Sequence, residues 1–189
     1  MELKKAEAIA LSTVELLKPH CDKIEVAGSI RRLKLDVKDI EIIAIPKDKI
    51  RIDVFGAKLK DGRANCFSEA VQQLGTILKG SPVDGRYVQI KMHQSINLDL
   101  FLPQPDDYYR QYAIRTGSSD YSRKVIATAW YKMGWCGTHE GLRKKRDCVA
   151  TASGWKWVKK DGEVPPVWQS EVEFFKWLRI TWIEPHLRK

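Results

Sequence analysis

The sequence predicts an α+β fold, in which a mixed sheet with flanking helices is followed by a small α+β C-terminal part. Three observations lead to this prediction. Apolar residues recur at helical spacing near the N-terminus. Short apolar runs bounded by glycine and proline follow, as is typical of strands. Composition and charge then change near Pro105, so we place a domain boundary between residues 1–105 and 106–189.

The first helix is predicted over residues 3–17, and Pro19 stops its pattern. Strands are predicted over residues 24–27 and 40–45, with a weaker one over 51–55. A helix over about 67–78 carries Ala70, Val71, Leu74 and Leu78 on one face, and Gly80 lies beyond its end.

Two further strands are predicted over residues 87–92 and 96–102. The second alternates, so Asp99 shares a face with Asn97 and Phe101 while Leu98 and Leu100 face the core.

All seven tryptophans lie in the C-terminal part, from Trp130 to Trp182. We interpret them as core residues, with base stacking as the alternative. The patterns predict a helix over 122–133, a short strand over 155–158 and a helix over 170–178, where Ser170 and Glu173 form a capping box.

The bulk composition is that of an ordinary globular protein, with 43% hydrophobic and 30% charged residues among 189. No segment approaches 18 uncharged apolar residues, and the N-terminus carries Glu and Lys where a signal peptide needs an apolar run. The four cysteines form no CxxC pair. We therefore expect a monomer that does not enter membranes and resides in the cytoplasm, with a nucleus or a viral factory as alternative intracellular locations.

The net charge of +9 is unevenly distributed. Residues 1–106 hold 17 lysines and arginines against 15 acids, whereas residues 107–189 hold 16 against 9. A basic C-terminal part favours a polyanionic partner, of which nucleic acid is the commonest; solubility alone is the simpler alternative.

The stretch from Ala27 to Ile45 carries the strongest chemical signal. On a strand, Asp39 and Glu41 lie on the same face, where two carboxylates repel unless cations or protons offset them. Carboxylate oxygens suit one or two hard divalent cations. The preceding Gly28-Ser29 turn offers amides and a hydroxyl, and the arginines that follow add positive charge, which together suit a polyphosphate. The alternative is a pair of solvated acids on a sheet face.

These residues carry a resemblance to a known family. The spacing Gly-Ser-x-Arg-Arg-x6-Asp-x-Asp/Glu resembles the nucleotidyltransferase palm signature of family X DNA polymerases, the DNA polymerase beta-like enzymes, and the matching residues are Gly28, Ser29, Arg31, Arg32, Asp39 and Glu41. The resemblance implies that residues 1–105 form a nucleotidyltransferase palm and that 106–189 form the C-terminal nucleotide- and DNA-binding subdomain.

The resemblance also implies the catalytic residues. In the family the third carboxylate lies on a later strand, after an intervening helix, and Asp99 occupies that place in the sequence, with Asp53 as the alternative. Asp39, Glu41 and Asp99 would hold two Mg2+ or Mn2+ ions. Gly28, Ser29 and Arg32 would bind the triphosphate, and Arg31 would be structural.

A second matching segment begins at Tyr108. Thr116, Gly117 and Ser118 match the family's aromatic-Thr-Gly-Ser segment beside the incoming sugar, which implies a cis peptide between Gly117 and Ser118. Arg115 stands where the family usually has an aromatic residue that packs against the sugar. Ser122 stands where many members carry an Asn that reads the minor groove of the nascent base pair, and a serine can still donate one hydrogen bond there. Arg123 is placed to stack on or near the template base, with a solvated helix residue as the alternative.

The tail resembles the family's closing pattern at Trp182, Pro185 and Arg188. We expect a minimal member without the lyase and hairpin-rich DNA-gripping domains, so DNA contacts would fall to basic residues and binding would be weak and salt-sensitive. The predicted DNA-binding residues, besides Arg123, are Arg143, Lys144, Lys145, Arg146, Lys159 and Lys160.

The resemblance implies a DNA polymerase that adds deoxynucleotides to a primer 3'-hydroxyl in short repair-type synthesis. Its partners would be a DNA primer-template and a deoxynucleoside triphosphate. The alternatives are a template-independent nucleotidyltransferase and a non-catalytic nucleic-acid-binding protein with the same fold.

Overall fold

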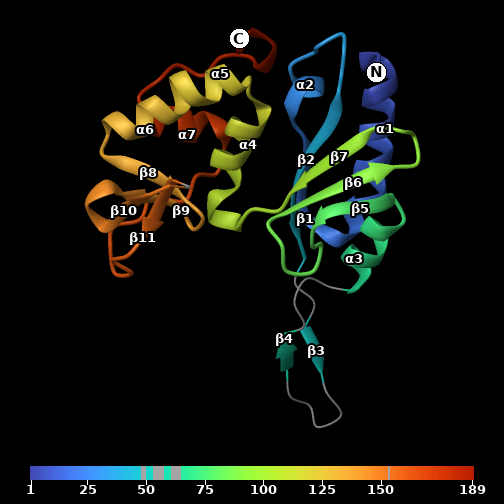
Figure 1. Cartoon of the computed structure of the whole chain (residues 1–189), viewed down its shortest axis with the longest axis horizontal. Coiled ribbons are helices and arrows are strands. Elements are labelled where there is room, and N and C mark those ends of the chain that lie inside the picture. Colours follow the sequence, from blue (N-terminus) through green and yellow to red (C-terminus); the bar gives the residue numbers. More distant parts are fainter. Residues whose placement is uncertain (48–49, 53–57, 61–64, 153) are drawn as a thin grey trace. The chain divides into compact units, whose positions relative to one another are not determined.

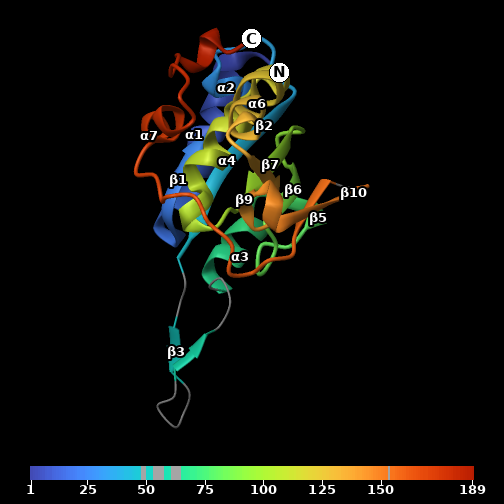
Figure 2. The same ribbon diagram turned by 90° about the vertical axis from the view of Figure 1, so that its left-hand side faces the viewer.

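The computed structural model describes residues 1–47, 50–52, 58–60, 65–152 and 154–189. The chain divides into two compact units, Met1–Tyr108 and Tyr109–Lys189, which Figures 1 and 2 show from two sides. The division lies close to the predicted boundary at residue 105. Both units mix helices and strands, so the α+β class predicted from the sequence is confirmed.

The first unit is built on a five-stranded mixed sheet in the order β1-β2-β7-β6-β5. Its strands are β1 (Cys21–Val26), β2 (Asp39–Pro46), β5 (Gly75–Gly80), β6 (Tyr87–Met92) and β7 (Asn97–Phe101). The β2 and β7 strands pair in parallel, whereas the other neighbours in the sheet are antiparallel. A separate hairpin consists of β3 (Ile50–Ile52) and β4 (Lys58–Lys60).

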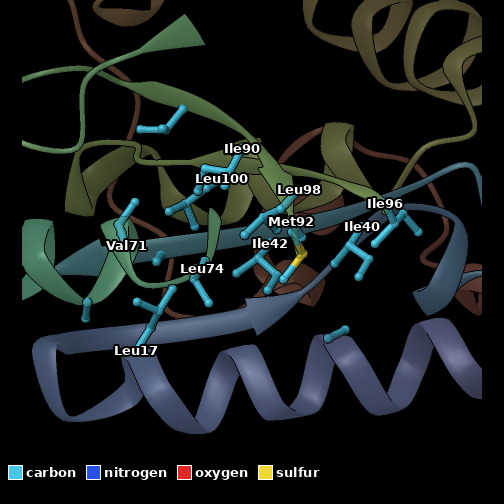
Figure 3. Packing of buried hydrophobic residues seen from close by; sticks show 14 of the residues in the cluster. Leu17, Ile40, Ile42, Val71, Leu74, Ile90, Met92, Ile96, Leu98 and Leu100 are labelled. Atoms are coloured by element: carbon cyan, nitrogen blue, oxygen red, sulfur yellow. The ribbon is translucent and has the colours of Figure 1, made fainter. Parts of the chain in front are cut away.

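Two helices, α1 (Leu3–Leu17) and α3 (Asn65–Gln72), cover one face of this sheet. The described part of the unit also contains the short helix α2 (Gly28–Arg31) and single 3-10 turns at Lys18–His20 and Pro105–Asp107. Figure 3 shows Leu17 of α1 and Val71 of α3 in the same apolar cluster as Ile40, Ile42 and Leu98 of the sheet. The alternating residues of β2 and β7 that point away from this core are free to carry polar side chains.

The first helix has the bounds expected from its spacing, and β6 agrees with the prediction residue for residue. The helix predicted over 67–78 is wrong beyond Gln72, because residues 75–80 form β5. The helix ends at Gln72, Gly75 begins β5 with a φ of 152°, and the β-branched Thr76 and Ile77 then pair with β6. Leu78, expected in the core, is 53% exposed.

The second unit places a helical segment and two hairpins around its own core. Its helices are α4 (Tyr108–Thr116), α5 (Ser119–Tyr121), the π-helical stretch η3 (Ser122–Ala127), α6 (Thr128–Lys132) and α7 (Glu171–Trp177), with 3-10 turns at Lys145–Asp147 and Pro185–Leu187. The hairpins are β8 (Trp135–Thr138) with β9 (Gly141–Lys144), and β10 (Cys148–Thr151) with β11 (Gly154–Trp157).

The capping box at α7 forms with one difference from the expected pattern. The Ser170 hydroxyl accepts a hydrogen bond from the Glu173 amide at 3.1 Å, as predicted. The Glu173 carboxylate accepts from the amide of Gln169, at 2.7 Å, rather than from that of Ser170. Both contacts satisfy donors at the start of the helix.

Most of the tryptophans belong to the core of this unit. Trp130, Trp135 and Trp168 are buried, and Trp177 and Trp182 pack against them, which confirms the interpretation of these five as core residues. The remaining two, Trp155 and Trp157, are half-buried and are not among the described members of that cluster.

Within the described residues, every helix is too short or too polar to cross a membrane.

We expect Cys21 and Cys136 to resist alkylation in the folded protein. Burial is the main cause that raises the pKa of each thiol to about 12, and at Cys136 a hydrogen bond with Cys148 adds to it. At pH 8 both therefore hold their protons, and the protonated thiol is a poor nucleophile. Iodoacetamide labelling followed by peptide mass spectrometry should show modification first at Cys66 and Cys148, which are partly exposed. In urea the difference should disappear; equal labelling without urea would contradict the prediction.

Candidate active site

Three carboxylates share the face of the sheet opposite α1. Asp39 and Glu41 alternate along β2, and Asp99 occupies the third position of β7. The parallel register places Glu41 beside Asp99 and Asp39 beside Asn97. Because paired strands lie about 4.8 Å apart, this register brings the three predicted acids together on adjacent strands. Asp53, the alternative third acid, lies outside the described residues.

The neighbouring strand β6 fixes Asp99. The Tyr87 hydroxyl donates to Asp99 Oδ1 at 2.6 Å, and Gln89 Nε2 donates to the same oxygen at 3.0 Å. The Oδ2 atom takes part in neither bond. Sequence reasoning missed both donors, although Tyr87 and Gln89 alternate on a predicted strand that pairs with β7.

The charges on this face repel one another. Burial, and after it the charge of Asp99, raise the pKa of Asp39 above its usual value. Burial also lowers the pKa of the Arg32 guanidinium, while the charges of Glu41 and Asp39 act in the opposite direction. The charges of Lys38 and, after it, Arg32 act in the opposite direction on the pKa of Asp39, and they offset only part of the effect of burial and of Asp99.

The Gly-Ser turn is joined to β2 beside Glu41. The amide of Ala27 donates to the Glu41 carbonyl at 2.8 Å, and Gly28 follows with a φ of 62°. A Cβ at Gly28 would overlap the Glu41 carboxylate, so the site requires glycine for its backbone and for its space. The Ser29 hydroxyl next to it is buried and has no hydrogen-bond partner among the residues that the structure describes.

These residues supply the oxygen donors that Mg2+ and Mn2+ prefer. Within the described ranges, no three His, Cys, Asp or Glu side chains are grouped closely enough to count as a preformed metal site. The hydrogen bonds from Tyr87 and Gln89 hold Asp99 Oδ1 toward β6 and leave Oδ2 outside both bonds. The carboxylates, the raised pKa of Asp39 and the unpartnered Ser29 hydroxyl nevertheless fit a site for cations and phosphate.

The second unit carries the Thr-Gly-Ser segment at the end of α4. The peptide between Gly117 and Ser118 is cis, which confirms that prediction, and Thr116 is fully buried. The Ser118 hydroxyl accepts from the Tyr121 amide at 3.2 Å. The Ser122 hydroxyl donates to the Ile114 carbonyl at 2.8 Å, so its hydrogen is already used and is not offered to a base.

The predicted DNA-binding residues lie on the surface of the second unit, mostly next to acids or aromatic rings. Arg123 pairs with Asp120 at 3.0 Å, Lys144 and Arg146 pair with Glu163 at 3.4 and 3.3 Å, and Lys160 pairs with Glu140 at 3.5 Å. Arg143 and Lys145 lie over the rings of Trp157 and Tyr131, respectively, and Lys159 is exposed. The side chains of Arg123, Arg146 and Lys160 are mostly exposed in their pairs. Exposed ion pairs of this kind stabilise little, so these three cations can exchange partners for phosphate.

Replacing Gly28 with alanine should destabilise the first unit and displace Glu41. A left-handed φ costs a residue with a Cβ about 1 kcal/mol, and the overlap with Glu41 adds to that cost. Gly134→Ala is the matched control, because Gly134 has a φ of 81° and nothing described within 4 Å of an added Cβ. Urea unfolding should show a larger loss for Gly28→Ala than for Gly134→Ala; equal losses would mean that the contact with Glu41 is unimportant.

Comparison with known proteins finds a family match for the C-terminal part. Residues 112–189 match the family model described as DNA polymerase beta thumb. The matched range contains the Thr-Gly-Ser segment and the closing pattern, so the resemblance is confirmed for this part of the chain and supports a DNA-polymerase-related role with DNA binding. None of the curated proteins matches the chain.

Proposed function

We propose that the chain is a DNA-directed DNA polymerase of the family X type, which transfers a deoxynucleotide from its triphosphate to a primer 3'-hydroxyl. The observation that carries the proposal is the register of β2 and β7, which sets Glu41 beside Asp99 with Asp39 on the same face. The match of residues 112–189 to a polymerase thumb supports it independently.

The acids would hold two divalent cations, Mg2+ or Mn2+. Asp39, Glu41 and Asp99 supply the carboxylate oxygens, and their mutual repulsion is the reason that cations stabilise the arrangement. When bound, such ions activate the attacking hydroxyl and neutralise the leaving pyrophosphate.

The protein groups bind and orient the substrates. The buried Ser29 hydroxyl and the Arg32 guanidinium bind triphosphate oxygens, and a charged hydrogen bond from Arg32 would be the stronger of the two. Asp99, fixed through Oδ1, presents Oδ2 to the primer hydroxyl and accepts its proton or passes it to water. Catalysis then depends on positioning and charge, without a covalent intermediate.

The test is extension of a labelled primer on a template. The purified chain should extend it with Mg2+ or Mn2+ and stop when EDTA is added. Glu41→Gln should lower the rate strongly, whereas Asp84→Asn, an exposed acid in the same unit, should leave it unchanged. Equal extension without template would identify an untemplated nucleotidyltransferase instead. DNA binding without extension under either metal would point to a non-catalytic binding protein.

A further inference from the structure

The two tryptophans outside the core share a face of β11. Trp155 and Trp157 are alternate residues and both are half-buried, whereas Lys156 between them is exposed. Strand geometry therefore places both rings on one side of the hairpin. Because these two half-buried tryptophans lie outside the described core cluster, core packing does not explain their presence on this strand.

Trp155 lines a pocket of about 310 Å³ within the second unit. Three aromatic residues, Trp130, Tyr131 and Trp155, form its walls together with Thr128, Gly137 and Arg123. The Tyr131 side is accessible, since this residue is 50% exposed. Pockets for small ligands span about 300–1,000 Å³, so this one lies at the small end of that range and has room for a single ring system.

Cations surround the aromatic residues. Lys145 Nζ lies 3.1 Å from the centre of the Tyr131 ring. The Arg143 guanidinium lies 4.1 Å from the Trp157 ring, and Lys160 Nζ lies 4.6 Å from the same ring. Arg143 is also the register partner of Cys136, which lines the pocket. The pocket for a flat ring thus lies beside several positive charges.

This combination selects a class of ligand. Aromatic walls bind the π-face of a base, and neighbouring cations bind the phosphates on either side of it. A duplex conceals its base faces inside the stack, whereas single-stranded DNA presents them. An acidic peptide would satisfy the cations but would leave the ring-lined pocket without a matching group.

We propose that this pocket binds one unpaired nucleobase of single-stranded DNA between Trp155 and Tyr131, with Arg123, Lys145 and Arg143 contacting the adjoining phosphates. The choice of DNA as the nucleic acid rests on the proposed function, because a polymerase must handle template that is not yet paired. The pocket itself is independent of the three carboxylates.

The test compares binding of single-stranded and duplex DNA by the full chain. The probe is a fluorescein-labelled oligo(dT) of twelve nucleotides, measured by anisotropy, beside a duplex of the same length. Trp155→Ala should weaken binding of the single strand about 5- to 150-fold and change duplex binding less than about twofold, because one stacking contact is lost. Trp155→Phe should recover most of the loss, and Val149→Ala, an exposed residue of the neighbouring strand, is the control.

A second measurement needs no protein variant. An abasic oligonucleotide keeps every phosphate but offers no ring, so the wild-type chain should bind it more weakly than oligo(dT) by a similar factor. Equal binding of the two, or unchanged binding by a folded Trp155→Ala variant, would overturn the proposal. Dependence on Trp155 for oligo(U) but not for oligo(dT) would overturn the choice of DNA.

The experiment also separates this inference from the proposed function. The Glu41→Gln variant should bind oligo(dT) as the wild type does, even though its rate of primer extension is strongly lowered. If the wild type fails to extend primers but binds oligo(dT) more tightly than the abasic strand through Trp155, the result supports base binding in the pocket and contradicts the polymerase proposal.

Discussion

Asp99→Asn is expected to abolish primer extension while nucleotide binding survives. Asp99 lies beside Glu41 in the parallel register, and its Oδ2 takes part in neither of the hydrogen bonds from β6. An amide in its place removes a negative charge and a proton acceptor from the position where both are needed. Loss of one such preorganised electrostatic group lowers the rate by about 10²- to 10³-fold.

Single-turnover extension measures the rate, and titration with a fluorescent nucleotide measures binding. Tyr87→Phe is the informative companion, because it removes the 2.6 Å hydrogen bond to Asp99 and keeps the carboxylate. A residue that orients a metal-binding carboxylate contributes about 10- to 100-fold in metal affinity, so Tyr87→Phe should raise the Mg2+ concentration required and be rescued by excess metal. Near-normal extension by Asp99→Asn would refute the role of Asp99.

Arg188→Met should strongly destabilise the second unit. The Arg188 guanidinium is fully buried and donates to both oxygens of Glu171, at 2.8 and 3.0 Å. Trp182 Nε1 donates to the same carboxylate at 2.8 Å, and the ring of Phe175 lies 4.9 Å from the guanidinium. Removing one partner leaves the Glu171 charge buried without its counter-ion, which costs about 3–5 kcal/mol.

Urea unfolding followed by tryptophan fluorescence reports on this unit directly, since all seven tryptophans lie in it. The double variant Glu171→Leu with Arg188→Met should be more stable than Arg188→Met alone, because no unpaired charge remains. Arg146→Met breaks the exposed pair with Glu163 and is the control, with little expected change. An Arg188→Met variant as stable as this control would show that the buried pair is unimportant.

The three acids could be located from the sequence because they alternate with apolar residues along their strands. Asp39, Glu41 and Asp99 interrupt apolar strands at alternate positions, and alternation alone fixes their face. It did not reveal which strands are neighbours, so the contact of Asp99 with Tyr87 and Gln89 emerged only from the order of the sheet.

The remaining differences arise where tertiary pairing outweighs local preference. The apolar spacing that predicted a helix extends to Leu78, yet residues 75–80 pair with β6 and form the edge strand β5. The strand predicted over 155–158 lies close to β11, whereas β8, β9 and β10 were not predicted. The buried residues of β8 and β9 are consecutive rather than alternating, and β10 is mostly exposed, so none of the three shows the alternation typical of a strand. The sequence analysis interpreted Trp155 as a core residue like Trp135. In the structure Trp135 belongs to the core cluster, whereas Trp155 lines the pocket beside Tyr131.

The parallel pairing of β2 with β7 bears on how such a protein can diversify over evolution. Five residue pairs, from Asp39 with Asn97 to Ile43 with Phe101, set the relative position of the two strands. Lengthening the connection between β2 and α3 changes the closure entropy only slowly, by about 0.6 kcal/mol for each doubling. Lineages can therefore acquire or lose sequence between these elements while the spacing of the acids is inherited unchanged.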